Sequence, residues 1–178
     1  MHFITTLDEL LQVLDQTETS DFPKVMKSLR LHASELKDYQ SWKSIGYSRN
    51  CIKRTPRFEL VLLCWNAGDA TPIHDHDGQK CWVYQVKGSI NEKRYQKEDN
   101  HIIETSCNPL HPGKLTYMDD RMGYHSLAND SSDKAMTLHF YMSPIDSCGY
   151  YCEEEKVFKR KTLTYDTFLS EKELANQP

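Results

Sequence analysis

The spacing of hydrophobic residues predicts helices in the first forty or so residues of this 178-residue chain. Leucines recur three and four residues apart over 7–16, and Thr6 with Glu9 has the form of a capping box at the start of that run. A second helix is expected from Asp21, with Pro23 marking its start and an apolar face beyond it. A short third helix is expected over about 34–39.

After residue 45 the pattern changes to short runs rich in Val, Ile, Tyr, Phe and Trp, separated by Gly, Pro, Asn and Asp, which is typical of an all-β domain. The run "FELVLLCWN" is apolar on both alternating faces, as expected of a strand covered on both sides. A closed or nearly closed barrel would provide that cover. The predicted strands lie near 58–66, 81–87, 89–96, 101–106, 114–119, 123–128, 135–142, 150–158 and 161–166.

These elements predict a mainly β protein with a single domain over 1–178: a mostly helical segment over 1–45 and a β-barrel over 46–170. The composition, with 27% charged and 38% hydrophobic residues, is that of a globular protein. A net charge of −4 gives no long-range attraction to nucleic acid or an anionic membrane. No apolar run approaches the roughly 20 residues of a membrane span, and no basic and then apolar leader begins the chain. We therefore expect a cytoplasmic monomer without nucleic-acid or membrane partners.

Three further features of the sequence are expected to have no special structural or functional role. The six cysteines are widely spread in a chain long enough to bury its own core, which favours free thiols over disulfides. The sequon at Asn129 is interpreted as chance, because no secretory route is evident. The basic cluster Lys159-Arg160-Lys161 is expected to form a solvated hairpin turn.

The segment "HDHDGQKC", residues 74–81, is the first candidate for chemistry. His74 and His76 are two residues apart, so on an extended segment both imidazoles leave the same face and can reach one ion. A His-x-His pair alone is a weak signal of metal binding. A third histidine, His125, comes later in the chain, and Asn129 follows it.

Together these residues resemble the cupin superfamily. Its first motif reads Gly, five residues, His-x-His, a few residues, Glu, six residues, Gly, and here that stretch is "GDATPIHDHDGQKCWVYQVKG" with Cys81 in place of the glutamate. Its second motif matches "HSLAN", residues 125–129, although the nearby glycine lies one position from the usual pattern. The resemblance implies a jelly-roll-like barrel and a metal held by His74, His76 and His125. Three neutral imidazoles leave a divalent metal its full charge and about three open positions, which favours an anionic substrate.

Within the cupins the chain resembles the cysteine dioxygenases from about Tyr47 to Cys148, with a similar helical N-terminus. The resemblance implies Fe(II) as the metal. It implies that Arg49, in "GYSRN", holds the substrate carboxylate with Tyr47 beside it, and that Cys148, in "PIDSC", lies near the pocket mouth. In one subgroup a cysteine matching Cys81 forms a thioether cross-link to a tyrosine, which here would be Tyr141 in "TLHFY".

The strand predicted over 135–142 has one polar and one apolar face. Thr137, His139 and Tyr141 share the first, which suggests a barrel lumen lined with polar groups. In the family this row is Ser-His-Tyr, a hydrogen-bonded relay in which His139 would orient Tyr141, and Thr137 keeps the hydroxyl that such a relay needs. The apolar face carries Met136, Leu138 and Phe140.

The chain departs from the family just after Tyr141. The family commonly has Ser-Pro-Pro with a cis peptide there, whereas this chain reads Met142-Ser143-Pro144. A cis bond before Ser143 would cost about 3 kcal/mol without the help of proline. Either that cost is borne locally, or the backbone runs trans and places Tyr141 slightly differently.

The resemblance implies a non-haem Fe(II) enzyme that adds both atoms of O2 to the sulfur of L-cysteine and forms cysteine sulfinic acid, a step of cysteine catabolism and taurine biosynthesis. Two alternatives stay open. A dioxygenase for 3-mercaptopropionate usually carries glutamine in place of Arg49, so the arginine favours cysteine. A non-catalytic metal-binding cupin would explain the histidines, but not the convergence of Arg49, Cys81 and Tyr141. Taken singly, each of those three could be structural: a surface ion-pair partner, a buried small hydrophobe and a core aromatic.

Overall fold

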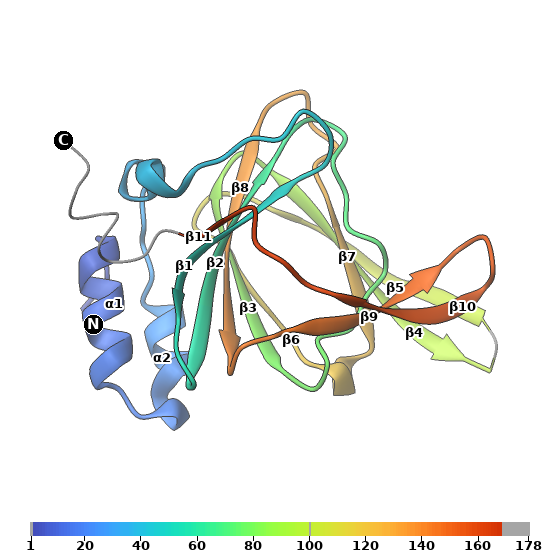
Figure 1. The fold of residues 1–178 in the computed structure, drawn as a ribbon, viewed down its shortest axis with the longest axis horizontal. Helices are drawn as coiled ribbons and strands as arrows, with labels where there is room; N and C mark the ends of the chain where they lie inside the picture. The colour runs from blue at the N-terminus through green and yellow to red at the C-terminus, as the bar shows by residue number, and fades with distance from the viewer. Residues whose placement is uncertain (1, 100, 169–178) are drawn as a thin grey trace.

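The computed structural model describes residues 2–99 and 101–168, and β-strands are their main regular structure (Figure 1). Six strands form one sheet in the order β11-β1-β2-β8-β3-β6, three form a second in the order β5-β4-β7, and β9 pairs with β10 in a two-stranded ribbon. The strands are β1 (Ser48–Arg54), β2 (Phe58–Trp65), β3 (Lys80–Lys87), β4 (Ile90–Glu98), β5 (His101–Leu110), β6 (Leu115–Met118), β7 (Tyr124–Ala128), β8 (Ala135–Met142), β9 (Ser147–Cys152), β10 (Val157–Thr162) and β11 (Thr167–Phe168).

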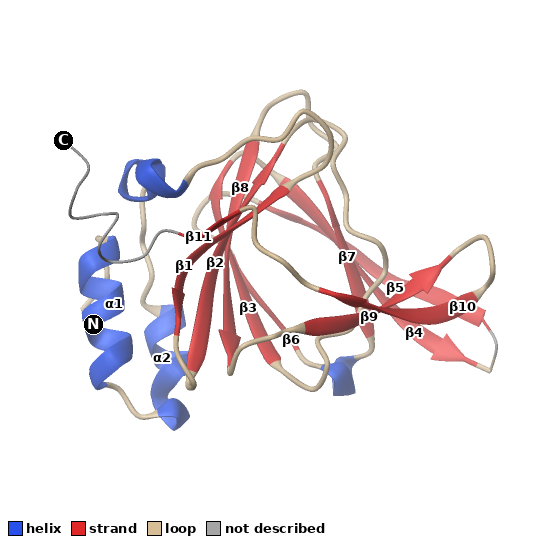
Figure 2. Cartoon of the chain, viewed as in Figure 1, coloured by secondary structure: helices blue, strands red, loops and turns tan. Residues whose placement is uncertain are grey.

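The predicted helical N-terminus is confirmed. Helices α1 (Leu7–Gln16) and α2 (Phe22–Lys27) begin close to their predicted positions, and the third predicted helix is a 3-10 helix over Ala33–Tyr39. The hydroxyl of Thr6 caps α1 by accepting a hydrogen bond from the backbone N–H of Glu9 at 3.3 Å. These helices cover one face of the six-stranded sheet (Figure 2).

Strand β2 shows why the chain needs this arrangement. All eight of its residues are buried, and the sheet separates their side chains into two clusters. Leu60 and Leu62 pack with the helices on the outer face, whereas Val61, Leu63 and Trp65 belong to a second cluster on the inner face. Burying each such aliphatic side chain stabilises the fold by roughly 1.5–3 kcal/mol. The predicted double cover of this strand is therefore confirmed.

The mainly β jelly-roll fold is also confirmed, but the barrel is not closed by hydrogen bonds. Among the described residues the strands remain in three separate sheets. The inner face of the six-stranded sheet and the β5-β4-β7 sheet lie on opposite sides of the interior, with the β9-β10 ribbon at one end (Figure 1). Residues 1, 100 and 169–178, including the last two of the expected barrel range, lie outside the described residues.

The strand predictions omit β1 and the two-residue β11, and they misplace the boundary between β9 and β10. Strand β1 is missing from the expected set, because "SRNCIKR" carries polar residues where a half-buried strand has apolar ones; buried Asn50 satisfies its amide by donating to the Leu62 carbonyl at 3.1 Å. The strands expected over 150–158 and 161–166 are instead β9 and β10, with the turn at 153–156 between them. Aromatic residues on both sides of "EEEK" made the two strands look like one run.

That shift also corrects the interpretation of Lys159-Arg160-Lys161. The three residues lie within β10 rather than in a turn, paired in register with β9.

The cysteines and the sequon agree with the sequence analysis: no disulfide joins the six cysteines, and the sequon is not available in the folded chain. Asn129 is fully buried, with its amide donating to the carbonyls of Asn66 and Asp133. Among the described residues, no helix combines the length and hydropathy needed to cross a membrane.

Candidate metal and substrate site

The structure brings the three motif histidines together by backbone pairing. His74 and His125 lie opposite each other on antiparallel segments, with the N–H of His74 donating to the His125 carbonyl at 2.9 Å and the reverse bond at 3.1 Å. On its other side this segment pairs with β9, where the N–H of Asp75 donates to the Gly149 carbonyl at 3.0 Å. The segment carrying His74 and His76 is therefore held between β7 and β9.

The three imidazoles form a compact cluster in the interior. One ligand nitrogen from each lies within 4.8 Å of the others, and the ring centroids are 4.6 to 5.3 Å apart. Burial lowers the pKa of His74 to about 4 and lowers the pKa values of His76 and His125 well below the usual value. All three rings are therefore neutral near pH 7, which is the form that binds a metal.

Hydrogen bonds leave nitrogens of this cluster available for an ion. The Nδ1–H of His74 donates to the Pro72 carbonyl at 2.9 Å, and that of His125 to Oε1 of Glu92 at 2.9 Å. Nε2 of His125 and Nδ1 of His76 are buried without a protein partner. Buried polar atoms need partners. A divalent metal bound by three imidazoles fits this cluster, and imidazole ligands suit iron among other transition metals.

Glu92 is a residue of the candidate site that the sequence analysis missed. It is buried, and its second oxygen accepts from the Thr116 hydroxyl at 2.8 Å and from Nη2 of Arg94 at 3.2 Å. A carboxylate behind a ligating histidine fixes the tautomer and orientation of the ring. The signal was its position on the same alternating face of the predicted strand as Ile90, which is also buried.

A second carboxylate holds the loop after His76. One Asp120 oxygen accepts from the His76 N–H at 2.8 Å, and the other accepts from the Gly78 N–H at 2.5 Å. Asp120 lies in a short 3-10 helix, Asp120–Met122, that ends at Gly123 with φ 94°. A side chain at Gly123 would place its Cβ 2.3 Å from the Tyr95 carbonyl oxygen. This glycine is therefore required for the chain to enter β7 and reach His125.

The polar row on β8 forms the expected relay. Nε1–H of Trp65 donates to the Thr137 hydroxyl at 2.9 Å, and that hydroxyl lies 2.9 Å from Nε2 of His139. On the other side of the ring, Nδ1 of His139 lies 3.4 Å from the Tyr141 hydroxyl, so the imidazole links Thr137 to Tyr141. Burial keeps His139 neutral by lowering its pKa well below the usual value. The Tyr141 hydroxyl is therefore held beside His139 at the wall of the pocket.

Arg49 points from β1 toward the same space. Its Nε and Nη2 atoms are buried without a protein partner, and it makes no ion pair with any described residue. Its backbone is fixed at the sheet edge, where its N–H donates to Asp166 at 2.8 Å. Tyr47 packs its ring on Trp65 with centroids 4.7 Å apart. The guanidinium is therefore placed to receive an anion from the pocket rather than from the protein.

Cys81 and Tyr141 are direct neighbours across two antiparallel strands. They are register partners on β3 and β8, and both are buried. Side chains of such a pair leave the sheet about 4.5–5.5 Å apart. Burial raises the pKa of both groups, so thiol and phenol are protonated at neutral pH.

The segment after Tyr141 contains no cis peptide. Ser143 instead adopts φ 74°, a left-handed conformation that serine rarely takes. Two hydrogen bonds hold this turn: the Ser143 N–H donates to the Arg57 carbonyl at 3.0 Å, and the Ile145 N–H donates to buried Glu59 at 2.9 Å. The backbone after Tyr141 therefore runs trans, as in the second of the two alternatives left open by the sequence.

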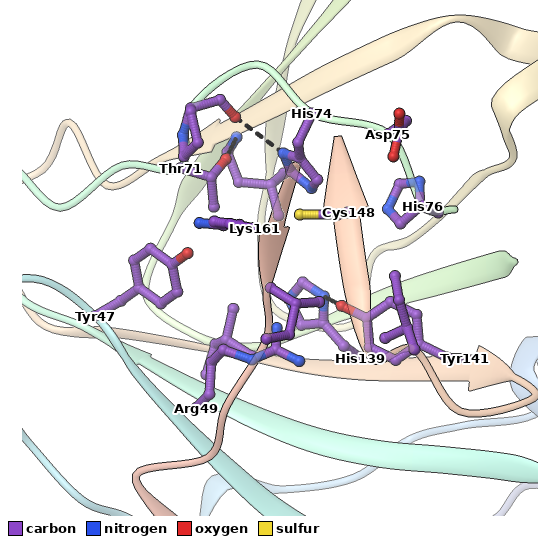
Figure 3. Close-up of a pocket in the computed structure, with 15 residues that line it drawn as sticks. Tyr47, Arg49, Thr71, His74, Asp75, His76, His139, Tyr141, Cys148 and Lys161 are labelled. Atoms are coloured by element: carbon purple, nitrogen blue, oxygen red, sulfur yellow. Dashed lines mark hydrogen bonds between the residues drawn. The ribbon is translucent and has the colours of Figure 1, made fainter. Parts of the chain in front are cut away.

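Several residues of the candidate site line one pocket (Figure 3). Arg49, Tyr47, His139 and Tyr141 lie on one side of it, with His74 and His76 across from them. Cys148, predicted near the mouth, also lines it, as does Lys161 from the misassigned basic cluster. A small ligand in this pocket would meet an imidazole cluster, a guanidinium and a phenol at the same time.

Comparisons with known proteins agree with this arrangement. The family described as cysteine dioxygenase type I matches residues 1–154. The chain is similar to human cysteine dioxygenase type 1, with 25% identity over 90% of this chain and 86% of that protein, and to the cattle protein of the same name, with 29% identity over 80% and 77%. Its fold is similar to that of TT1209 from Thermus thermophilus, with a TM-score of 0.50, 21% identity and coverage of 61% of this chain and 93% of that one. The family match spans most of the chain, and the chain therefore belongs to the cysteine dioxygenase type I family.

Proposed function

We propose that this protein is a cysteine dioxygenase that adds both atoms of O2 to the sulfur of L-cysteine and gives cysteine sulfinic acid. The observation that carries the proposal is that buried nitrogens without hydrogen-bond partners occur at two places in this site. The imidazole cluster has buried nitrogens without partners, and so has the Arg49 guanidinium. A small thiol with a carboxylate would supply partners at both places, because its sulfur would bind a metal held by the imidazole cluster and its carboxylate would bind Arg49.

We assign His74, His76 and His125 as ligands of Fe(II). When bound there, the ion supplies activation of O2 and a lowered pKa for a coordinated thiol. The protein contributes the neutral ligands, and it excludes water by burying His76 and His125. The carboxylate of a cysteine bound in the pocket would face Arg49, which lies across from His74 and His76.

Arg49 would hold that carboxylate by a two-point hydrogen-bonded pair, which lysine does not reproduce. Tyr47 and Cys148 would shape the substrate end of the pocket, which both residues line. Tyr141 would hydrogen-bond the substrate or oxygen, because its hydroxyl lines the pocket beside His139. His139 acts in this scheme by orienting Tyr141.

We also propose a thioether between Cys81 and Tyr141. Their register and shared burial support it, and the bond would hold Tyr141 more firmly than its long 3.4 Å contact with His139 does. Cross-linking removes two hydrogens and is an oxidation, for which O2 at the iron-loaded site would be the oxidant, so the intact mass of purified protein should be about two units lower than the sequence mass. C81A should lack this mass difference and turn over cysteine more slowly, because Tyr141 loses its tether.

Oxygen consumption by the iron-loaded protein tests the function. L-cysteine should support uptake, with cysteine sulfinate as product carrying both atoms of labelled O2, whereas 3-mercaptopropionate and cysteamine should be poor substrates. A preference for 3-mercaptopropionate would identify the related thiol dioxygenase. Iron binding without uptake on any of these thiols would identify a non-catalytic metal-binding cupin. We further propose that the chain is one domain over 1–178, acts as a cytoplasmic monomer in cysteine catabolism, and supplies taurine biosynthesis.

A further inference from the structure

The pocket contains a second cation that the proposed function does not use. Lys161 lies on β10 opposite Cys148 of β9, and both residues line the pocket together with Arg49. In Figure 3 the Lys161 side chain is drawn between Tyr47 and Cys148. Burial raises the pKa of the Cys148 thiol, and the positive charge of Lys161 opposes that rise. Lys161 therefore acts electrostatically on the pocket.

The neighbouring basic residues on β10 have acidic partners, and Lys161 has none among the described residues. Lys159 pairs with Glu155, and Arg160 pairs with Asp77 at 2.7 Å. The Lys161 ammonium lies over the ring of Tyr150, 5.9 Å from its centroid. The pocket's own acidic lining residue, Asp75, is already engaged, because its Oδ1 accepts from the Gly149 N–H at 2.7 Å.

Lys161 also lies where the pocket meets the outside. A shallow hollow adjoins the pocket and shares Tyr47, Arg49, Lys161 and Leu163 with it. The second lysine of that hollow, Lys43, pairs with Asp166 at 3.1 Å. A ligand that enters through the hollow thus meets the unpaired Lys161 ammonium on its way to Arg49.

We propose that Lys161 is a second carboxylate-binding residue at the pocket mouth, which makes this pocket selective for thiols that carry a carboxylate. The proposal rests on the assignment of a thiol substrate to the same pocket. The lysine ammonium is a point charge on a flexible stem, so it attracts an anion without demanding a fixed geometry. Arg49, with two buried nitrogens, then fixes the orientation. Lys161 contributes to binding and discrimination rather than to oxygen transfer.

The test is equilibrium binding to iron-loaded protein without oxygen, measured by calorimetry with L-cysteine and with L-cysteinamide. The amide keeps the thiol and the amine but has no carboxylate. K161M retains the apolar stem and loses the charge, and K161R retains the charge. K159M is the matched control, because it removes the same charge from the same strand outside the pocket.

The expected result is a Kd for cysteine about three- to tenfold higher in K161M, as for a partly exposed ion pair, and close to wild type in K161R and K159M. The Kd for cysteinamide should be unchanged or lower in K161M. In turnover assays with cysteine, K161M should raise KM by a similar factor and leave kcat within about twofold.

Three results would overturn the proposal. K161M and K159M could weaken cysteine binding equally, which would indicate a long-range effect of net charge. Cysteine and cysteinamide could weaken equally, or K161R could weaken binding as much as K161M, which would indicate packing. Finally, the Kd for cysteine could be unchanged in K161M. Because binding is measured without turnover, a protein that binds cysteine through Lys161 but consumes no oxygen would contradict the proposed function alone.

Discussion

The two sides of the pocket are built in different ways. The six-stranded sheet presents Arg49, Cys81 and Tyr141 from paired positions near the ends of its strands, where register fixes each position. The opposite side presents His74 and His76 from an irregular segment that is held by backbone bonds to β7 and β9. Metal binding and substrate orientation therefore depend on different elements of the fold. Substitutions should therefore separate iron retention from substrate affinity.

The largest effect is expected on the histidine side. H125A removes one of three ligands, so iron retention should be lost and activity should fall at least about 1000-fold. Iron content by metal analysis and oxygen uptake with cysteine check this prediction. H111Q, at an exposed histidine outside the pocket, is the control. Full iron loading in H125A would break the assignment of that side to metal binding.

On the sheet side, R49Q should leave iron content unchanged and raise the KM for cysteine by about 100-fold, because a charge-assisted contact to the carboxylate is lost. Steady-state oxygen uptake over a range of cysteine concentrations measures it. K53Q is the matched control, since Lys53 lies on the same strand and pairs with Asp15 outside the pocket. Loss of iron in R49Q would show that metal binding and substrate orientation do not depend on different elements.

Glu92 sharpens the comparison within the histidine side. E92Q removes the charge behind His125 while keeping the size of the side chain, and it should weaken iron affinity by about 10- to 100-fold. Competition with a chelator measures the affinity, and thermal unfolding of the iron-free protein reports whether the fold is intact. The exposed E104Q, on neighbouring β5, should change neither quantity. Unchanged iron affinity in E92Q would limit Glu92 to a structural role.

The smallest expected effect is on the stability of the iron-free protein. Burial lowers the pKa of His74 to about 4, whereas the ring titrates near 6.5 in the unfolded chain. The unfolded state therefore binds more protons between these values, and the free energy of unfolding falls as the pH decreases below 6.5. His74 should account for about 1 kcal/mol of that fall between pH 6.5 and 5.5. Urea unfolding at the two pH values should show a smaller fall in H74Q than in H111Q, and equal falls would contradict the prediction.

The fold could be predicted where side-chain alternation matched burial. Strand β2 and the two faces of β8 were clear, because apolar residues occupy the positions that the sheet buries. Strand β1 was not, because buried Ser48 and Asn50 are satisfied by hydrogen bonds that only the folded chain reveals. The separation of β9 from β10 depended on a turn hidden between aromatic residues.

The residues of the candidate site likewise fall into those that a sequence pattern identifies and those that only the folded chain reveals. His74, His76 and His125 were found because a fixed spacing along the chain identifies them, and the structure places them together. Glu92 and Lys161 belong to no spacing motif. Their positions depend on which way β4 and β10 face the interior, and a charged residue in a strand is more often solvated. Tertiary register, rather than local pattern, decides the location of such residues.

The register pairing of Cys81 with Tyr141 has a consequence for the whole molecule. A covalent bond there would close a ring of about sixty residues that contains the entire β5-β4-β7 sheet and His125. Such closure restricts the unfolded ensemble and is worth roughly 4 kcal/mol in the chain-entropy view. Formation of the cross-link would then stabilise the fold. Cross-linked molecules should unfold at a higher temperature than molecules without the link in the same preparation.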